Sequence, residues 1–324
     1  MREIRYYEAL IEAQAEEMRR DERVFVMGED VGLFGGTFRA TEGLMAEFTS
    51  RRVRDTPIAE AGIVGLALGA ALGGLRPVPE LRTMNVAIVA MDQIINHVAK
   101  ARTMFGGQFE LPITIRAPGG GGTQKGAQHS HSIESWFVNA PGIRVVIPST
   151  PHDAKGLLKT SIRCNDPVLF IEHEMLYSTK GPVPEGELLI PLGQADVKRP
   201  GRDVTIVAWS RMALEALRAA EELAAEGIEA EVLDPRTLDP FDWESLYASV
   251  ARTRRCVIAE EGWRTVGVGA EIAARLQENL FYQLDAPVGR VASVDVPLPY
   301  AKNLEQAALP HADDIVRAVL KIAT

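Results

Sequence analysis

The stretch that most constrains the fold is residues 55–74, DTPIAEAGIVGLALGAALGG. It places one carboxylate, Glu60, directly ahead of a run of small residues. Gly65, Gly69 and Gly73 recur every four residues, so on a helix they share one face. Each glycine costs a helix about 1 kcal/mol relative to alanine. Three of them therefore indicate a helix that approaches another backbone closely.

Glu60 stands where a predicted strand, 53–58, meets this predicted helix. Because α/β proteins bind ligands at the rim of the sheet where strands end, Glu60 is a candidate site residue. A helix-capping role explains its position equally well, since Asp and Glu are common in a first helical turn.

Short apolar runs alternate with amphipathic patterns along most of the chain, which predicts two α/β domains with a mostly parallel sheet. The strands expected are 24–27, 53–58, 77–81, 111–117, 145–147, 168–172, 204–209, 229–233, 255–260 and 288–294. The helices expected besides the glycine-rich one are 3–20, 41–50, 86–104, 151–161, 211–226, 242–250 and 268–280. Proline and glycine punctuate 181–202, which indicates a linker between a domain at 1–180 and a domain at 203–324.

Charge and cysteine content exclude several classes of protein. A net charge of −9 argues against a nucleic-acid partner, which needs a basic face, and against binding to anionic membranes. Cys164 and Cys256 are too few for a disulfide framework or a zinc site, which fits a reducing compartment. The weakly polar run 62–75 is too short to span a bilayer, and the N-terminus has no signal-peptide pattern. We therefore expect a cytoplasmic protein without a membrane partner.

His129 and His131 form an H-x-H pattern in the glycine-dense loop PGGGGTQKGAQHSHS. Zinc needs three or four ligands, and no further cysteine or histidine cluster completes a set. An imidazole on a mobile loop suits proton transfer or binding of an anionic substrate. An ordinary surface histidine remains the alternative.

Other motifs of known chemistry are incomplete or missing. GVGAE at 267–271 is half of a dinucleotide-binding fingerprint, but Ile272 replaces the third glycine and EEGWRT separates the pattern from its strand. A tight helix start explains it better. The chain has no G-x-S-x-G elbow, Walker-A loop or H-E-x-x-H motif, so hydrolase, NTPase and metalloprotease functions lose support.

A series of motifs covers nearly the whole chain in order. They are MGEDVG at 27–32, GGTFRATEGL at 35–44, RVRDTPIAEAGIVGLALGAALGGLRPVPE at 52–80, MDQIINHVAK at 91–100, QHSHS at 128–132, PSTPHDAKGLLK at 148–159, LDPRTLDPFD at 233–242, EEGW at 260–263, GVGAEIA at 267–273, LDAPVGRV at 284–291 and DVPLPYAKNLE at 295–305. Together they resemble the beta subunit of the thiamine-diphosphate-dependent 2-oxo acid dehydrogenases, a family that includes the pyruvate, branched-chain and acetoin dehydrogenases.

The resemblance implies a pyrimidine-binding domain followed by a transketolase-C-like domain. It also implies that Glu60 hydrogen-bonds the aminopyrimidine ring of thiamine diphosphate. Ile58 and Ala59 would line the same pocket, with Glu29 as a polar neighbour.

The resemblance assigns the second catalytic role to His129, which would hold the substrate and help to transfer the acyl group to a lipoyl arm. His131 departs from the family pattern and receives no role. Arg82 stands where a neutral residue is commoner and is placed to reach the substrate carboxylate. Family members often carry aromatic residues around 84–88, where this chain has MNVAI. The smaller Val86 would either widen the pocket or leave space that the partner subunit fills.

The diphosphate-binding GDG motif of thiamine enzymes is absent from the sequence. The resemblance therefore implies that an alpha subunit carries the Mg²⁺ and the other half of the site, in an α2β2 heterotetramer. It also implies docking to a dihydrolipoyl acyltransferase core with its lipoyl domain. The turn at 161–167 resembles a K⁺-binding turn, but Cys164 replaces an oxygen ligand there, and a thiol is a poor ligand for a hard cation.

The expected activity is that of a pyruvate-type 2-oxo acid dehydrogenase, because EEGW, GVGAEIA and DVPLPYAKNLE look most like the pyruvate branch. Branched-chain 2-oxo acids or acetoin are the alternative substrates. A non-catalytic scaffold subunit is a rival from another class, against which intact Glu60 and His129 argue. A single-chain transketolase-like enzyme is a third alternative, which the missing diphosphate motif disfavours.

Overall fold

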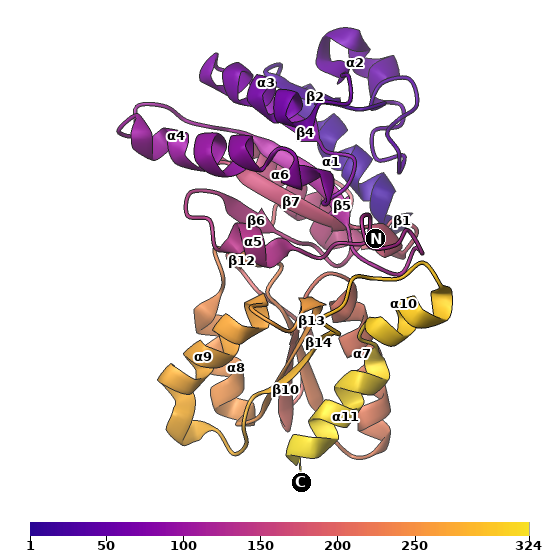
Figure 1. The fold of residues 1–324 in the computed structure, drawn as a ribbon, viewed down its shortest axis with the longest axis vertical. Coiled ribbons are helices and arrows are strands. Elements are labelled where there is room, and N and C mark those ends of the chain that lie inside the picture. The colour runs from indigo at the N-terminus through magenta and orange to yellow at the C-terminus, as the bar shows by residue number, and fades with distance from the viewer. Residues whose placement is uncertain (324) are drawn as a thin grey trace. The chain divides into compact units, whose positions relative to one another are not determined.

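The structure is a computed structural model that describes residues 1–323 and divides into two compact units (Figure 1). The first unit contains residues 1–120 and 136–192, and the second contains residues 121–135 and those from 193 onward. The glycine-dense segment 121–135 lies within the range 1–180 that we expected to form the first domain, yet it packs with the second unit. The domain limits expected from the sequence stay a prediction.

Up to residue 192 the chain alternates strands and helices. The elements are β1 (Arg2–Arg5), α1 (Tyr6–Arg20), β2 (Val24–Gly28), α2 (Leu44–Arg52), β3 (Val53–Asp55), α3 (Glu60–Leu72), β4 (Arg76–Glu80), α4 (Ala99–Met104), β5 (Thr114–Gly119), α5 (Glu134–Val138), β6 (Arg144–Val146), α6 (Pro151–Arg163), β7 (Val168–His173) and β8 (Lys180–Val183). Within the first unit the large sheet has the strand order β6-β7-β5-β4-β2-β3, and each neighbouring pair is parallel.

The second unit is built around a smaller sheet with the order β14-β13-β10-β11-β9. Its elements after residue 192 are β9 (Asp196–Arg199), β10 (Val204–Ala208), α7 (Arg211–Ala225), β11 (Ala230–Asp234), β12 (Thr237–Asp239), α8 (Trp243–Thr253), β13 (Cys256–Trp263), α9 (Val268–Leu280), β14 (Gly289–Ser293), α10 (Lys302–Ala308) and α11 (Ala312–Ala323). Only β9 runs antiparallel to its neighbour in this sheet. The predicted fold class, two α/β domains with mostly parallel sheets, is confirmed.

The start of the chain differs from the prediction. The helix expected over 3–20 begins at Tyr6, because Arg2–Arg5 form a strand that pairs antiparallel with β8. β8 itself falls at the start of the predicted linker. Local periodicity cannot reveal this pairing, because the two strands are almost 180 residues apart.

Two further elements are shorter than predicted. The strand expected over 53–58 ends at Asp55, and Pro57 lies just beyond it, without the backbone N–H that a sheet needs. The helix expected over 86–104 is divided into a 3₁₀ turn at Val86–Ile88, a π-helical stretch at Asp92–Val98 and α4. β-Branched residues are frequent in this stretch and lower its preference for a regular α-helix.

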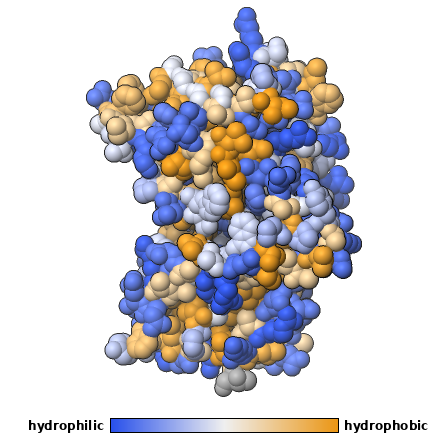
Figure 2. Space-filling model, viewed as in Figure 1, coloured by the Kyte–Doolittle hydropathy of each residue, from blue (hydrophilic) through white to orange (hydrophobic). Residues whose placement is uncertain are grey.

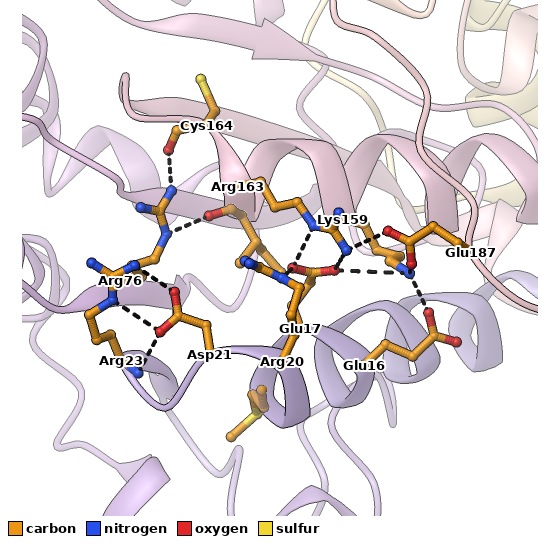
Figure 3. A network of polar contacts seen from close by, with 12 residues as sticks. Glu16, Glu17, Arg20, Asp21, Arg23, Arg76, Lys159, Arg163, Cys164 and Glu187 are labelled. Carbon is orange, nitrogen blue, oxygen red and sulfur yellow. Dashed lines mark hydrogen bonds and ion pairs between the residues drawn. The ribbon is translucent and has the colours of Figure 1, made fainter.

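Helices α1 and α6 are joined by a network of ion pairs (Figure 3). The side chains of Lys155 and Lys159 on α6 are 1% exposed, and both ammonium groups contact Glu16 on α1. Lys159 also contacts Glu187, at 2.9 Å. Buried ammonium groups are costly unless they are paired, so these contacts make the packing of α1 against α6 specific.

The glycine face of α3 is not packed against another backbone within residues 1–323. A Cβ atom at Gly65 would lie 3.6 Å from the side chain of Gln93, and one at Gly69 would meet open space. The apolar side chains of Leu66, at 64% exposed, and Leu72 also remain accessible on this helix. Figure 2 shows apolar atoms among polar ones on the part of the surface that α3 and α4 form. Among the described residues, no helix is long and apolar enough to cross a membrane.

Candidate functional site

Glu60 is the first residue of α3, at the rim where the parallel strands β2, β3 and β4 end. It is 8% exposed, and within residues 1–323 its carboxylate accepts no hydrogen bond and forms no ion pair. A buried carboxylate without a partner is expensive, so a position that keeps one is suited to a ligand that donates a hydrogen bond.

Glu29 follows β2, and its carboxylate is close enough to that of Glu60 for the two negative charges to repel each other. Burial raises the pKa of Glu29, and the negative charge of Glu60 raises it further, while Arg82 opposes the shift. The Arg82 guanidinium is 4.0 Å from the Glu29 carboxylate, and Oε1 of Glu29 is buried without a hydrogen-bond partner among the described residues. The structure therefore brings the charged groups of Glu29, Glu60 and Arg82 near one another.

The close approach of the neighbouring strand explains the glycine at the end of β2. A Cβ atom at Gly28 would lie 2.6 Å from the carbonyl oxygen of Glu80, which is too close for any side chain. Gly28 thus lets β2 and β4 end side by side, and the chain turns into Glu29 at that point.

The other residues expected to line the site are less enclosed. Ala59 is the N-cap of α3 and is exposed, and Ile58 is 76% exposed in the connection after β3. Val86 begins the 3₁₀ turn and is half-buried. A cavity of about 750 Å³ lies elsewhere in the first unit, lined by Met45 and Leu66 among others, and none of the predicted site residues lines it.

A buried ionic cluster lies in the same sheet and was missed by the sequence analysis. The Arg116 side chain on β5 is 0% exposed and donates to both carboxylate oxygens of Glu172, at 2.7 and 2.9 Å. It also donates to Glu80 on β4, at 2.7 Å, and the hydroxyl of Tyr177 donates to Glu172. The signal was available, because Glu80, Arg116 and Glu172 each interrupt an apolar strand pattern.

The second candidate, His129, belongs to the second unit and is exposed. Its backbone N–H donates to the carbonyl of Gly126, at 3.2 Å, so it follows a tight turn of the glycine-dense loop. His131 is half-buried with its ring 6.1 Å from that of Trp263, and burial lowers its pKa. Among the described residues, no cluster of three or more His, Cys, Asp or Glu side chains could hold a metal ion.

Glu134, a few residues after this loop, is a buried carboxyl of the second unit. Burial raises the pKa of Glu134 to about 7, and the charges of Glu260 and Glu261 act in the same direction. The indole Nε1 of Trp209 donates to Oε1 of Glu134, at 3.1 Å. Neither motif analysis nor periodicity singles out this glutamate.

Replacing Glu134 by glutamine is expected to stabilise the chain at pH 8 by up to about 3 kcal/mol. The pKa of Glu134 in the folded chain, about 7, lies above the ordinary value of 4.5, so stability falls as pH rises between these values. Glutamine cannot ionise, and its carbonyl still accepts from Trp209. Urea unfolding at pH 5 and pH 8 measures the effect. An unchanged pH dependence in E134Q would contradict the assignment, and the exposed Glu271→Gln provides the control.

The turn that resembles a K⁺ site is occupied by an arginine side chain (Figure 3). Arg76 donates to the carbonyl oxygens of Ile162, at 3.0 Å, and Cys164, at 2.8 Å, and to Oδ1 of Asn165. These oxygens at the C-terminus of α6 therefore already accept hydrogen bonds from the positively charged side chain of Arg76. The residues of this turn do not fit a K⁺ ion.

Comparison with known families divides the chain into two matched regions. Residues 2–180 match the family described as transketolase, pyrimidine binding domain, and residues 193–315 match transketolase, C-terminal domain. A solved chain titled "Split gene transketolase, inactive beta4 tetramer" has a TM-score of 0.81 and 28% identity, and the match covers 99% of this chain and 98% of that one.

Curated relatives match over nearly the full length. The Arabidopsis thaliana protein "Pyruvate dehydrogenase E1 component subunit beta-1, mitochondrial" is 48% identical, over 98% of this chain and 88% of its own length. "Pyruvate dehydrogenase E1 component subunit beta" of Gracilaria tenuistipitata var. liui is 44% identical, over 99% of this chain and 100% of its own. The protein of the same name from Rhizobium meliloti (strain 1021) is 47% identical, over 96% of this chain and 68% of its own.

Proposed function

We propose that this chain, which belongs to the beta-subunit family of the thiamine-diphosphate-dependent pyruvate dehydrogenase E1 components, contributes Glu60 to the pyrimidine half of the cofactor site. The observation that carries the proposal is the Glu60 carboxylate at the rim of a parallel sheet, which is buried and has no partner among the residues that the structure describes. An aminopyrimidine ring offers the hydrogen-bond partner that this carboxylate lacks.

The residues around Glu60 fit the cofactor. Oε1 of Glu29 is a second buried acceptor that has no partner within residues 1–323, and Ile58 and Ala59 leave accessible apolar surface at the start of α3. When bound, thiamine diphosphate supplies the carbon nucleophile that attacks the carbonyl of a 2-oxo acid. Glu60 holds the proton at the pyrimidine ring nitrogen, which is the contribution of this chain to activating the cofactor.

We assign the handling of substrate to His129 and Arg82. The exposed imidazole of His129 binds the substrate and assists transfer of the acyl group to a lipoyl arm. The guanidinium of Arg82 is about half exposed, and among the described residues it has only a long contact to Glu29. It provides a positive charge for the substrate carboxylate. Val86 leaves space where a larger side chain would narrow the pocket.

The proposal includes an alpha subunit as an obligatory partner, in an α2β2 heterotetramer, because this sequence has no diphosphate-binding motif. We place the Mg²⁺ on that subunit, and we derive no step from K⁺. The exposed apolar face of α3 supports assembly with another chain. A dihydrolipoyl acyltransferase core and a cytoplasmic location complete the proposal, although several relatives carry "mitochondrial" in their names.

Turnover by the purified pair of subunits tests this function. Pyruvate, branched-chain 2-oxo acids and acetoin are compared with lipoamide or a lipoyl domain as acceptor. We expect pyruvate to have the highest kcat/KM and neither subunit alone to turn over. Cofactor binding without turnover of any of these substrates would support the scaffold alternative. A preference for another substrate would move the assignment to another branch of the family.

A further inference from the structure

The loop that carries His129 is anchored by two buried carboxylates of the second unit. Oε1 of Glu261, on β13, accepts from the backbone N–H of Gly121 and from the hydroxyl of Ser132, both at 2.8 Å. Glu261 therefore binds the loop at one residue before His129 and at one residue after it. The side chain of Glu261 is 6% exposed, so these contacts replace the water that a carboxylate would otherwise bind.

The second anchor is Glu305 on α10, which is 1% exposed. Its Oε1 accepts from the backbone N–H of Gly122, at 3.1 Å, and of Gln124, at 3.0 Å, and its Oε2 lies 3.2 Å from the same Gln124 nitrogen. Hydrogen bonds from amides to a carboxylate are about twice as strong as those between neutral groups. Glu305 lies in DVPLPYAKNLE, a motif to which the proposed function assigns no role.

The chain before and after Glu305 also forms an apolar support under the loop. Gly121 packs on Leu298 and Leu309, and a Cβ atom there would lie 2.8 Å from Leu309. Gly126 packs on the ring of Tyr300, where a Cβ atom would lie 2.6 Å from the ring, and its φ of +75° also favours glycine. The carbonyl of Gly126 accepts from the backbone N–H of His129. The packing of Gly126 on Tyr300 therefore also restrains the backbone at His129.

Arg211 connects the two anchors. Its Nε donates to Oε2 of Glu261, at 2.5 Å, and its Nη2 donates to the carbonyl of Pro310, at 3.0 Å, just beyond α10. The strand that carries Glu261 and the segment that follows Glu305 are thus held by one guanidinium. A glycine-dense loop has high conformational freedom when unrestrained, so such anchors are needed to keep its imidazole in one place.

We propose that Glu305, together with Glu261, is a positioning residue for His129. The carboxylates hold the loop by its backbone, at Gly121, Gly122 and Gln124, and Arg211 and Tyr300 complete the support. The inference rests on the proposed function of His129, since positioning matters only if the imidazole acts on the substrate.

Glu305→Ala and Glu305→Gln test the inference in the chain assembled with its alpha subunit. Hydrogen–deuterium exchange measures the loop directly, without reference to activity. We expect E305A to speed exchange in the peptide that covers 121–135 while the peptide that covers 151–163 is unchanged. Because glutamine keeps one acceptor oxygen but turns an amide group toward the second N–H, E305Q is expected to fall between E305A and wild type.

The kinetic readout separates positioning from a general loss of structure. Misplacing a catalytic group by about 1 Å costs on the order of 10²-fold in rate, so we expect E305A to lower kcat by about 10- to 100-fold. The concentration of thiamine diphosphate that gives half-maximal activity is expected to stay unchanged. Glu271→Gln, at an exposed glutamate on α9, is the matched control.

The outcomes distinguish this inference from the proposed function. Wild-type exchange and wild-type kcat in both Glu305 variants would overturn the positioning role. If E305A fails to assemble, E305Q carries the test by the same criteria. Faster loop exchange with unchanged kcat would also overturn it, because His129 would then act without a fixed loop. An inactive wild-type pair in which E305A still speeds exchange of the loop would contradict the proposed function and leave the anchoring of the loop established.

Discussion

Replacing Glu60 by glutamine is expected to lower turnover of the 2-oxo acid by about 10²- to 10⁴-fold, the range that a positioned proton-transfer group contributes. Glutamine has the size of glutamate and fits at the first position of α3, so the fold should be retained. It cannot carry the charge that pairs with a protonated pyrimidine nitrogen. Steady-state turnover by the assembled enzyme at saturating thiamine diphosphate measures the loss.

The stability of the same variant provides an internal check. Since the Glu60 carboxylate is buried and has no partner in the described part of the chain, its removal should leave the chain as stable as wild type or more stable. Glu47→Gln, at an exposed glutamate on α2, is the matched control and should keep full turnover. Wild-type turnover in E60Q would contradict the catalytic assignment, whatever its stability.

Replacing Arg116 by leucine is expected to cost about 3–5 kcal/mol of stability, because it removes one partner from a buried ionic cluster. The variant would leave the carboxylates of Glu80 and Glu172 facing each other without a compensating charge. Burial already raises the pKa of Glu80, and loss of Arg116 removes the interaction that opposes this shift. Urea unfolding of R116L and of a control variant, Arg19→Leu, measures the loss in free energy of unfolding.

Arg19→Leu is the matched control for this prediction. Arg19 forms an exposed ion pair with Glu47, and such pairs contribute about 0–1 kcal/mol. Adding Glu80→Gln and Glu172→Gln to R116L should recover part of the loss, since both buried charges disappear. If R116L lost less stability than Arg19→Leu, the buried cluster would not be what holds the sheet together.

The parts of the fold that were predicted correctly depend on local patterns. Central parallel strands such as β2, β5 and β7 are short apolar runs with a buried side chain at almost every position, and these runs are visible in the sequence. The start of α3 at Glu60 also follows from its neighbours, because the strand, the proline and the small residues occur in succession. The family expected from the motifs was confirmed by the full-length relatives.

The parts that were missed depend on contacts between distant residues. The antiparallel pair β1–β8 joins the first residues of the chain to a segment near residue 180, and neither strand has a strong pattern alone. The loop at 121–135 shows no periodicity, and its anchors, Glu261 and Glu305, lie more than 120 residues away in the sequence. Arg116 shows the same limit, since the sequence shows a charge in a strand but not its partners.

We propose that this chain provides only the pyrimidine half of the cofactor site. The most direct test of this half-site assignment is a calorimetric titration of thiamine diphosphate and Mg²⁺ into this chain alone and into the mixture with its alpha subunit. We expect no tight binding by the lone chain, because the diphosphate-binding motif is absent from its sequence. We expect tight binding by the mixture that is weakened in E60Q. Tight binding by the lone chain, or binding by the mixture that is indifferent to Glu60, would contradict the assignment.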